Sequence, residues 1–326
     1  MSAILDLAAQ NLLSPVILCF ALGLAAALAR SDLSFPEAIA KGMSLYLLFA
    51  IGFKGGVSVA AHGVDLGLAL AVLAGITLSL GLPFIAFSLL RTLSPGVSVL
   101  DAAAVAGHYG SISIVTFVAM SALLTGQGLE AEGYMIAVAA AMEAPAIVAA
   151  LWLVSRKGGE SRVGGELWRE ILLNGSIVLL MGAFVIGWVT GEDGMVEIAP
   201  FIVTPFKGVL CLFLLDMGLV AGRGLRSARG VITPGIAVFG VVMPLIGAAL
   251  GLGAGFVLGL STGGVAALTA LAASASYIAV PAAMRVALPR ANPALYLTLS
   301  LGITFPFNLT LGLPLYVALA RVVTGG

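Results

Sequence analysis

The chain has 326 residues, of which 61% are hydrophobic and only 9% are charged, and its formal net charge is zero. Soluble domains carry roughly 25% charged residues, and folding leaves much of even a large domain in water. This composition, with a mean hydropathy of +1.17, excludes a soluble enzyme and a nucleic-acid-binding protein. The chain needs a lipid bilayer as its solvent.

Ten apolar segments are long enough to cross a bilayer, which takes about 20 residues of helix. We expect an all-α polytopic membrane protein whose ten helices run roughly over 12–30, 39–60, 66–91, 97–125, 131–154, 171–190, 197–222, 231–259, 262–288 and 294–321. The two cysteines lie inside apolar runs, so they indicate neither a disulfide framework nor a metal cluster.

The connecting loops alternate in charge. Loops after even-numbered segments contain no Lys or Arg but several acidic residues, namely Asp65, Glu130, Glu132, Glu192, Asp193 and Glu197. Loops after odd-numbered segments hold the basic ones, namely Arg30, Lys41, Arg91, Arg156, Lys157, Arg162, Arg169, Arg223, Arg226, Arg229 and Arg290. Because cytoplasmic loops are enriched in Lys and Arg, we expect the odd loops in the cytoplasm and both termini outside.

A link over 156–168 divides the segments five and five, within a single membrane domain of residues 1–326. An odd number of spans in each half inverts the second half, as in many secondary transporters. Short echoes support repeats of about 1–155 and 169–326. They pair Lys54-Gly55-Gly56 with Asp216-Met217-Gly218, residues 107–114 with 273–280, and 143–145 with 304–308.

The fourth and ninth segments consist of small and polar residues at mid-membrane depth, which predicts broken helices. A helix that restarts after a break presents free N–H groups and a partial positive charge, which suit an anion. Carbonyl and hydroxyl oxygens of the unwound stretches suit a small cation. The candidate substrate-binding residues are Gly110, Ser111, Ile112, Ser113, Ser274, Ala275, Ser276 and Tyr277. The alternative is that Gly and Ser only permit close helix packing.

Glu143 lies in the middle of the fifth segment, where a charge is costly and usually functional. It could ligate sodium, carry a proton or pair with a neighbour. The candidate sodium ligands are Ser111, Glu143, Ser276, Thr304 and Asn308. The alternative for Thr304 and Asn308 is an interhelical hydrogen bond.

The sequence gives specific expectations for four further polar residues. Lys54 and Asp216 hold matching positions in the second and seventh segments, so we predict a structural or gating ion pair between them. His108 adjoins the first break and is expected to be a packed, hydrogen-bonded imidazole, the alternative being a pH-responsive group. Asp101 follows Ser98 by three residues, which is the spacing of a capping box.

Several of these runs resemble the sodium-dependent bicarbonate transporter family. They are Ala106–Ser113, Ala272–Ile278, Pro281–Arg285 and Pro289–Ala294, with shorter likenesses at Gly55-Gly56, Met142–Ala146 and Asp216–Gly218. The resemblance covers essentially the whole chain. It implies a core domain and a gate domain, a homotrimer in the bacterial inner membrane, and sodium-coupled symport of bicarbonate by an elevator-type alternating access. It implies no enzymatic activity and no cofactor besides Na⁺ as the coupling ion.

The chain departs from the family in two places. Family members carry an acidic residue in the second break, where this chain has Tyr277. Their link between the halves is longer than residues 156–168, which weighs against the PII-like cytoplasmic regulator that the resemblance implies as a partner.

Other functions stay open on the sequence. One is a sodium- or proton-coupled carrier of another small carboxylate, and another is a passive channel. A membrane-embedded enzyme would need a nucleophile with a base, or paired aspartates, and the spacing of Asp101, His108 and Asp216 suggests neither.

Overall fold

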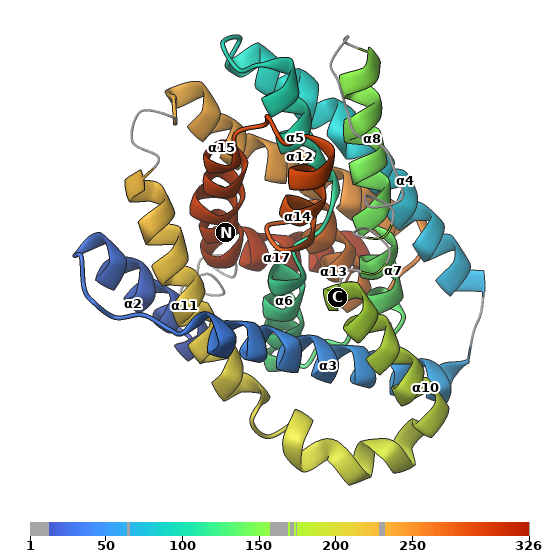
Figure 1. Cartoon of the computed structure of the whole chain (residues 1–326). Coiled ribbons are helices and arrows are strands. Elements are labelled where there is room, and N and C mark those ends of the chain that lie inside the picture. Colours follow the sequence, from blue (N-terminus) through green and yellow to red (C-terminus); the bar gives the residue numbers. More distant parts are fainter. Residues whose placement is uncertain are drawn as a thin grey trace.

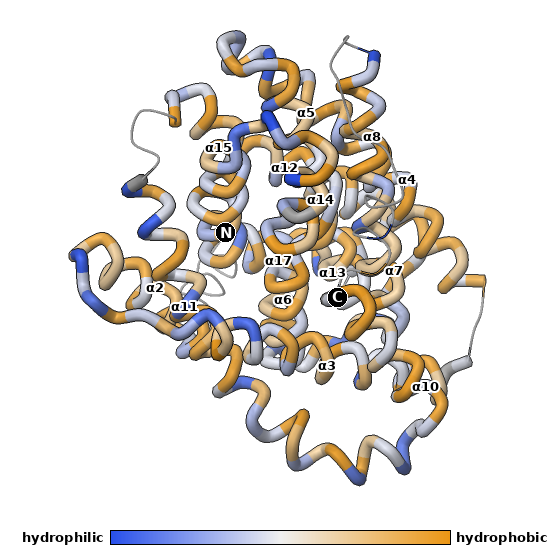
Figure 2. Tube along the Cα trace, viewed as in Figure 1, coloured by the Kyte–Doolittle hydropathy of each residue, from blue (hydrophilic) through white to orange (hydrophobic). Residues whose placement is uncertain are grey.

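The computed structural model describes residues 13–63, 66–156, 169, 173, 175–227 and 232–325, and within them it contains helices and turns but no strand. Eight helical stretches are long and apolar enough to cross a membrane: Glu37–Ala61, Leu66–Leu93, Val99–Gly126, Met135–Arg156, Ile177–Ile202, Phe206–Arg226, Pro234–Val257 and Pro293–Thr324. Apolar residues dominate them, as Figure 2 shows. The expectation of an all-helical, multi-pass membrane protein is confirmed.

The first and ninth predicted segments contain shorter apolar helices, Pro15–Leu28 and Thr262–Ala272. The count of ten crossings stays a prediction. The sixth predicted segment ends next to a real interruption: Gly191, with φ 58° and ψ −146°, is non-helical and divides the stretch Gly175–Ile202 into two helices at a kink, since glycine adopts positive φ without steric cost. The seventh segment, predicted to begin at residue 197, was placed too early, because its helix begins only at Phe206. The predicted link over 156–168 lies outside the described residues, apart from Arg156.

Four helices form an outer layer, which in Figure 1 follows the left and lower sides of the molecule. They are α2 (Pro15–Leu28), α3 (Glu37–His62), α10 (Gly175–Ile202) and α11 (Phe206–Ser227). Helix α2 packs along α11, and α3 packs along α10. In both pairs the helix backbones lie in direct contact. A side chain at Gly23 would collide with the carbonyl of Leu215, and one at Gly56 would collide with the carbonyl of Phe184.

The remaining helices form an inner bundle (Figure 1). Its first part contains α4 (Leu66–Leu93), α5 (Val99–Gly110), α6 (Ile114–Gly126), α7 (Met135–Ala141) and α8 (Glu143–Arg156). Its second part contains α12 (Pro234–Val257), α13 (Thr262–Ala272), α14 (Ala279–Ala287), α15 (Pro293–Leu297), α16 (Phe305–Phe307) and α17 (Leu313–Thr324). Helices α4, α5 and α8 pack on one another, and α13 packs on α12 and α17.

Both predicted helix breaks are present. Helix α5 ends at Gly110 and α6 begins at Ile114, which leaves Ser111–Ser113 as the first break. Helix α13 ends at Ala272 and α14 begins at Ala279, which leaves 273–278 as the second break. Ser113 restarts its helix as an N-cap, because its Oγ accepts a hydrogen bond of 3.2 Å from the Thr116 N–H, as serine commonly does.

The last segment is irregular in a way that the sequence did not predict. Two π-helical stretches, η1 (Thr298–Thr304) and η2 (Asn308–Gly312), flank the single turn of α16. A π-helical stretch is rare and occurs frequently at functional sites. Here the wider turns carry Thr304 and Asn308 at their edges next to α16.

Candidate functional site

The two breaks lie against each other and exchange hydrogen bonds. The Ser113 N–H donates to Ser274 Oγ at 2.8 Å, and the Ser276 N–H donates to the His108 carbonyl at 2.8 Å. Backbone groups freed by a broken helix have no water to bind inside a bilayer, so protein must satisfy them. The second break therefore supplies a partner to the first, and the last turn of α5 supplies one to the second break, although 161 residues separate Ser113 from Ser274.

Several polar atoms around the breaks are buried without a partner among the described residues. They are Ser111 Oγ, Thr116 Oγ1, Glu143 Oε2, Tyr277 OH and His108 Nε2. Native structures rarely leave buried polar atoms unpaired. Here Glu143 and Tyr277 line one cavity, while Ser111 lies in the first break and Thr116 and His108 lie in the helix turns next to it. Such a concentration is typical of a site that a polar ligand completes.

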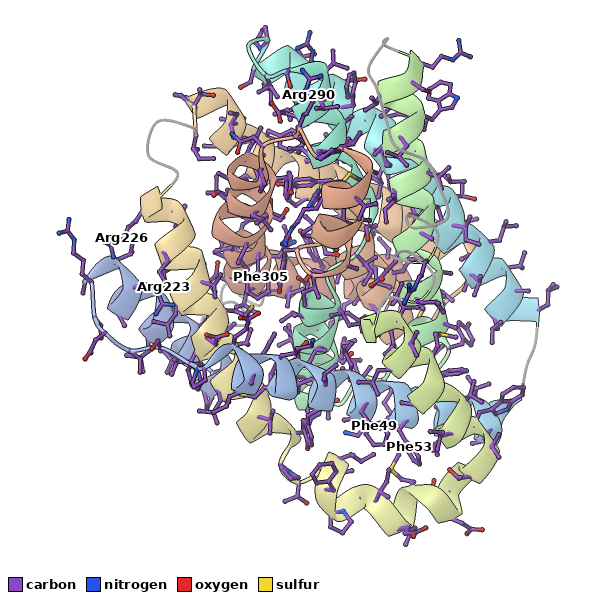
Figure 3. The ribbon with its side chains drawn as sticks, viewed as in Figure 1. Phe49, Phe53, Arg223, Arg226, Arg290 and Phe305 are labelled. Carbon is purple, nitrogen blue, oxygen red and sulfur yellow. The ribbon has the colours of Figure 1, made fainter. Side chains whose placement is uncertain are left out.

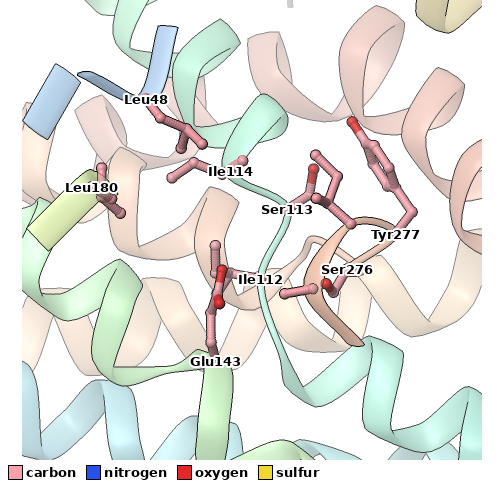
Figure 4. A pocket seen from close by; sticks show the side chains of 10 residues that line it. Leu48, Ile112, Ser113, Ile114, Glu143, Leu180, Ser276 and Tyr277 are labelled. Carbon is pink, nitrogen blue, oxygen red and sulfur yellow. The ribbon is translucent and has the colours of Figure 1, made fainter. Parts of the chain in front are cut away.

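A small central cavity lies between the breaks and Glu143 (Figure 4). Its polar lining comes from Ser113 in the first break, Ser276 and Tyr277 in the second break, and Glu143 at the start of α8. Its volume of about 10 Å³ is comparable with the space that one water molecule needs. In this conformation the two breaks are thus closed tightly around their polar groups.

Glu143 is 7% exposed and faces the apolar part of this cavity. Figure 4 shows it pointing toward Ile112, with Leu48 and Leu180 nearby, whereas Ser113, Ser276 and Tyr277 lie across the extended segment. Within the described ranges it forms no ion pair, and its Oε2 has no hydrogen-bond donor. A carboxyl group at this depth needs a cation or a proton to be tolerated.

Thr304 and Asn308 are engaged in hydrogen bonds between helices. Thr304 Oγ1 donates to the Gly240 carbonyl at 2.7 Å and lies 2.6 Å from Tyr109 OH. Asn308 Nδ2 donates to the Ala273 carbonyl at 2.8 Å, and its Oδ1 accepts from Tyr316 OH at 2.7 Å. These contacts match the alternative that the sequence left open, and sodium coordination by these two residues stays a prediction.

Lys54 and Asp216 are not brought together in this conformation. Lys54 Nζ lies 4.7 Å from the centroid of the Phe206 ring, where a cation is favoured by the ring electrons. Asp216 is buried ten residues further along α11, about 15 Å away at 1.5 Å per residue. This separation along the helix explains why the predicted pair does not form here.

Gly110 and Ala275 line the breaks through their backbones. A side chain at Gly110 would collide with Pro83 of α4, so its missing Cβ is required by helix packing. Ala275, at 2% exposure, lies between the two serines of the second break.

Two of the polar expectations near α5 are met. The His108 ring stacks on Tyr296 at 4.4 Å between centroids, and its Nδ1 lies 2.7 Å from the Ala104 carbonyl, which fits a packed imidazole. The Ser98 Oγ accepts from the Asp101 N–H at 3.0 Å, which confirms the cap. Asp101 also accepts from the Asn292 N–H at 2.7 Å and so ties α5 to the start of α15.

Sequence reasoning missed one supporting residue, Ser79. Its Oγ donates to the Met142 carbonyl at 2.5 Å, and its side chain is fully buried. This bond positions the junction between α7 and α8, at which Glu143 begins. A serine inside an apolar segment gives no local signal of a partner 63 residues away.

Comparison with known families agrees with this geometry. The model of the Na⁺-dependent bicarbonate transporter superfamily matches residues 15–321 of the chain. No curated protein matches the chain. The chain therefore belongs to the Na⁺-dependent bicarbonate transporter superfamily, a family of membrane transporters.

Proposed function

We propose that this member of the superfamily is a sodium-coupled symporter that takes up a small anion, bicarbonate first among the candidates. One observation carries the proposal beyond family membership: two broken helices are joined inside the membrane, and Ser111 Oγ, Glu143 Oε2 and Tyr277 OH remain unpaired around them. Broken helices with polar centres are the usual binding sites of secondary transporters.

The anion would bind between the breaks. Helices α6 and α14 restart there, so their first N–H groups and partial positive charge favour a negative ligand. The hydroxyl groups of the breaks add neutral donors that match the oxygen atoms of bicarbonate. The proposed anion-binding residues remain Gly110, Ser111, Ile112, Ser113, Ser274, Ala275, Ser276 and Tyr277.

The sodium ion would bind beside the anion and offset its charge. Ser111, Glu143 and Ser276 supply oxygen atoms at the breaks, the ligand type that a hard cation prefers. Thr304 and Asn308 would act at the edge of this site, where their hydrogen bonds fix Gly240 and Ala273. No other cofactor is part of the proposal.

The architecture would be two inverted five-helix repeats, with the outer layer as the gate domain and the inner bundle as the core domain. The pairing of α2 with α11 and of α3 with α10 supports it. In such repeats α2 corresponds to α10 and α3 corresponds to α11, so the contact of α2 with α11 is equivalent to the contact of α10 with α3. An elevator-type motion would then carry the breaks past the outer layer, in a homotrimer in the bacterial inner membrane. A PII-like regulator would have to act on the link over 156–168, of which the structure describes only Arg156.

Uptake into proteoliposomes tests the function. The purified chain should accumulate labelled bicarbonate when an inward sodium gradient is imposed, and should not do so when potassium replaces sodium. Ser111→Ala and Ser276→Ala should reduce uptake on the order of tenfold or more, since each lost charge-assisted hydrogen bond is worth about 1.5–3 kcal/mol.

A matched control is Ser88→Ala, because Ser88 is exposed on α4 and donates only to the Phe84 carbonyl of its own helix. It should transport at the parent rate. Sodium-independent uptake, or equal loss in Ser88→Ala and Ser111→Ala, would contradict the proposal.

A second function is favoured by one observation, the apolar surroundings of Glu143. A carboxyl group packed against Ile112 and Leu180 is a poor cage for Na⁺, which prefers several oxygen ligands, but it can hold a proton. The alternative is thus a proton-coupled carrier of a small carboxylate. Uptake of labelled acetate driven by a pH gradient without sodium, and lost in Glu143→Gln, would support it over the first proposal.

A further inference from the structure

A large second cavity opens on the side of the breaks that faces the outer layer. Its volume is about 450 Å³, and its described lining includes Lys41 and Ser44 of α3, Met217 of α11, and Tyr277 and Ile278 of the second break. This vestibule lies near the beginning of α3 and the second half of α11. Arg223 and Arg226 mark the same end of α11 in Figure 3.

Two residues separate the vestibule from the central cavity. Tyr277 and Ile278 line both spaces, and Tyr277 is 9% exposed. Its hydroxyl group lies near the Ser113 side chain but makes no hydrogen bond of good geometry within the part of the chain that is described. Tyr277 and Ile278 therefore form a shared wall between a water-sized cavity and a much larger one, and Tyr277 contributes its only polar side chain.

The Tyr277 ring is held by an aromatic chain that reaches the outer layer. Tyr277 contacts Phe305 edge-to-face, with ring centroids 5.4 Å apart. Phe305 contacts Phe20 of α2 in the same way at 5.5 Å. Phe305 belongs to α16, between the two π-helical stretches. Displacement of the inner bundle against α2 would disturb this stack and release the tyrosine ring.

The opposite end of the molecule differs. A cavity of about 160 Å³ lies between α2, α6 and α17 and is lined by Ala122, Gln127 and Lys207 among others. It has no lining residue in common with the central cavity. Of the two larger cavities, only the vestibule therefore adjoins the breaks.

We propose that Tyr277, braced by Phe305 and Phe20, is the gate between the binding site and a cytoplasmic vestibule, and that the structure represents an inward-facing state with this gate shut. The proposal rests on the proposed transport function and on the orientation that the loop charges indicate. In it the ring must move before an ion or anion can leave the central cavity, and its hydroxyl group can donate a hydrogen bond to the departing anion.

Cysteine accessibility tests the vestibule without reference to the cargo. In a background with Cys19→Ser and Cys211→Ser, the variant Ser44→Cys should react with a membrane-impermeant maleimide added from the cytoplasmic side of oriented vesicles. Ala122→Cys, in the cavity at the opposite end, is the matched control and should not react from that side. Reaction of Ser44→Cys from the outer side alone would overturn the inward-facing assignment.

A second set of variants tests the gate itself. Ile112→Cys places a thiol in the central cavity, behind the ring. Tyr277→Ala should accelerate its labelling on the order of tenfold, the factor that a barrier lowered by about 1.4 kcal/mol gives. Tyr277→Phe keeps the ring and should leave the rate unchanged. Equal rates with Tyr, Phe and Ala at position 277 would overturn the gate.

Two controls keep these results interpretable. Monodisperse elution and the melting temperature show whether Tyr277→Ala is folded, and if it is not, Phe305→Leu should accelerate labelling through loss of the ring contact. Failure of bicarbonate uptake with the expected labelling pattern would contradict the proposed cargo but not the gate. Normal sodium-driven uptake with unchanged labelling in both variants would contradict the gate alone.

Discussion

Ser274 connects the two breaks through one oxygen atom. Its Oγ accepts from the Ser113 N–H at 2.8 Å and donates to the Leu271 carbonyl at 2.8 Å. In Ser274→Ala the Ser113 N–H would be left buried without a partner, which costs about 1–3 kcal/mol. We therefore expect a lower melting temperature in detergent, together with reduced transport.

The control for this change is Ser121→Ala. Ser121 is half-buried on α6 and donates only to the Phe117 carbonyl in its own helix, so its loss leaves no N–H group unpaired. A melting temperature that falls equally in Ser274→Ala and Ser121→Ala would show that the bond between the breaks does not stabilise the fold.

At the scale of helices, the position of the first break depends on how α5 meets α4. A Cβ at Gly110 would collide with the Pro83 ring and lie 2.9 Å from the Ser79 carbonyl. Because overpacking in a well-packed core costs typically about 1–3 kcal/mol, Gly110→Ala should lower the melting temperature and shift Ser111 out of place. Uptake should fall more than stability alone explains.

Gly126→Ala provides the comparison, because apart from its chain neighbours and the nearby backbone of its own helix no atom lies within 4 Å of the added Cβ. That variant should be as stable as the parent, since alanine favours helix more than glycine does. If Gly110→Ala behaves like Gly126→Ala in both melting and uptake, the close contact of α4 with α5 is not what positions the break.

For the whole molecule, the sorting of loop charges predicts an orientation. In a background with Cys19→Ser and Cys211→Ser, Asp193→Cys should react with an impermeant maleimide on intact cells. Arg290→Cys should react only after the cells are permeabilised, because the positive-inside rule places its loop in the cytoplasm. Both positions are exposed. Labelling of Arg290→Cys on intact cells would reverse the topology, and with it the side to which the vestibule opens.

Much of the architecture could be read from local sequence. Hydropathy locates most of the helices within a few residues, and small polar runs such as 107–113 and 273–278 locate both breaks. These features depend on residues that are neighbours in the chain and on their preference for lipid or water, and both can be read from the sequence. The seventh segment was predicted to begin at residue 197, whereas its helix begins at Phe206, because residues 192–202 form a separate helical piece after the kink at Gly191.

Partners of individual side chains were decided by tertiary packing. The sequence indicated that Ser113, Ser274, Thr304 and Asn308 matter, but not which oxygen binds which group. Lys54 illustrates the limit: its place in the repeat suggested a pair with Asp216, whereas the packing of α3 on its neighbours places it over Phe206. Contacts between segments depend on the angles and offsets of whole helices, which local sequence does not specify.

By itself, then, the sequence determined the solvent, the helices and the two breaks, because hydropathy and backbone hydrogen bonding are local properties. Only the tertiary structure decided that the breaks touch, that Glu143 reaches their cavity, and that Tyr277 separates this cavity from the vestibule. These features need residues more than a hundred positions apart to meet, and the packing of the two parts of the inner bundle on each other, as of α13 on α6 and of α14 on α8, is what brings them together.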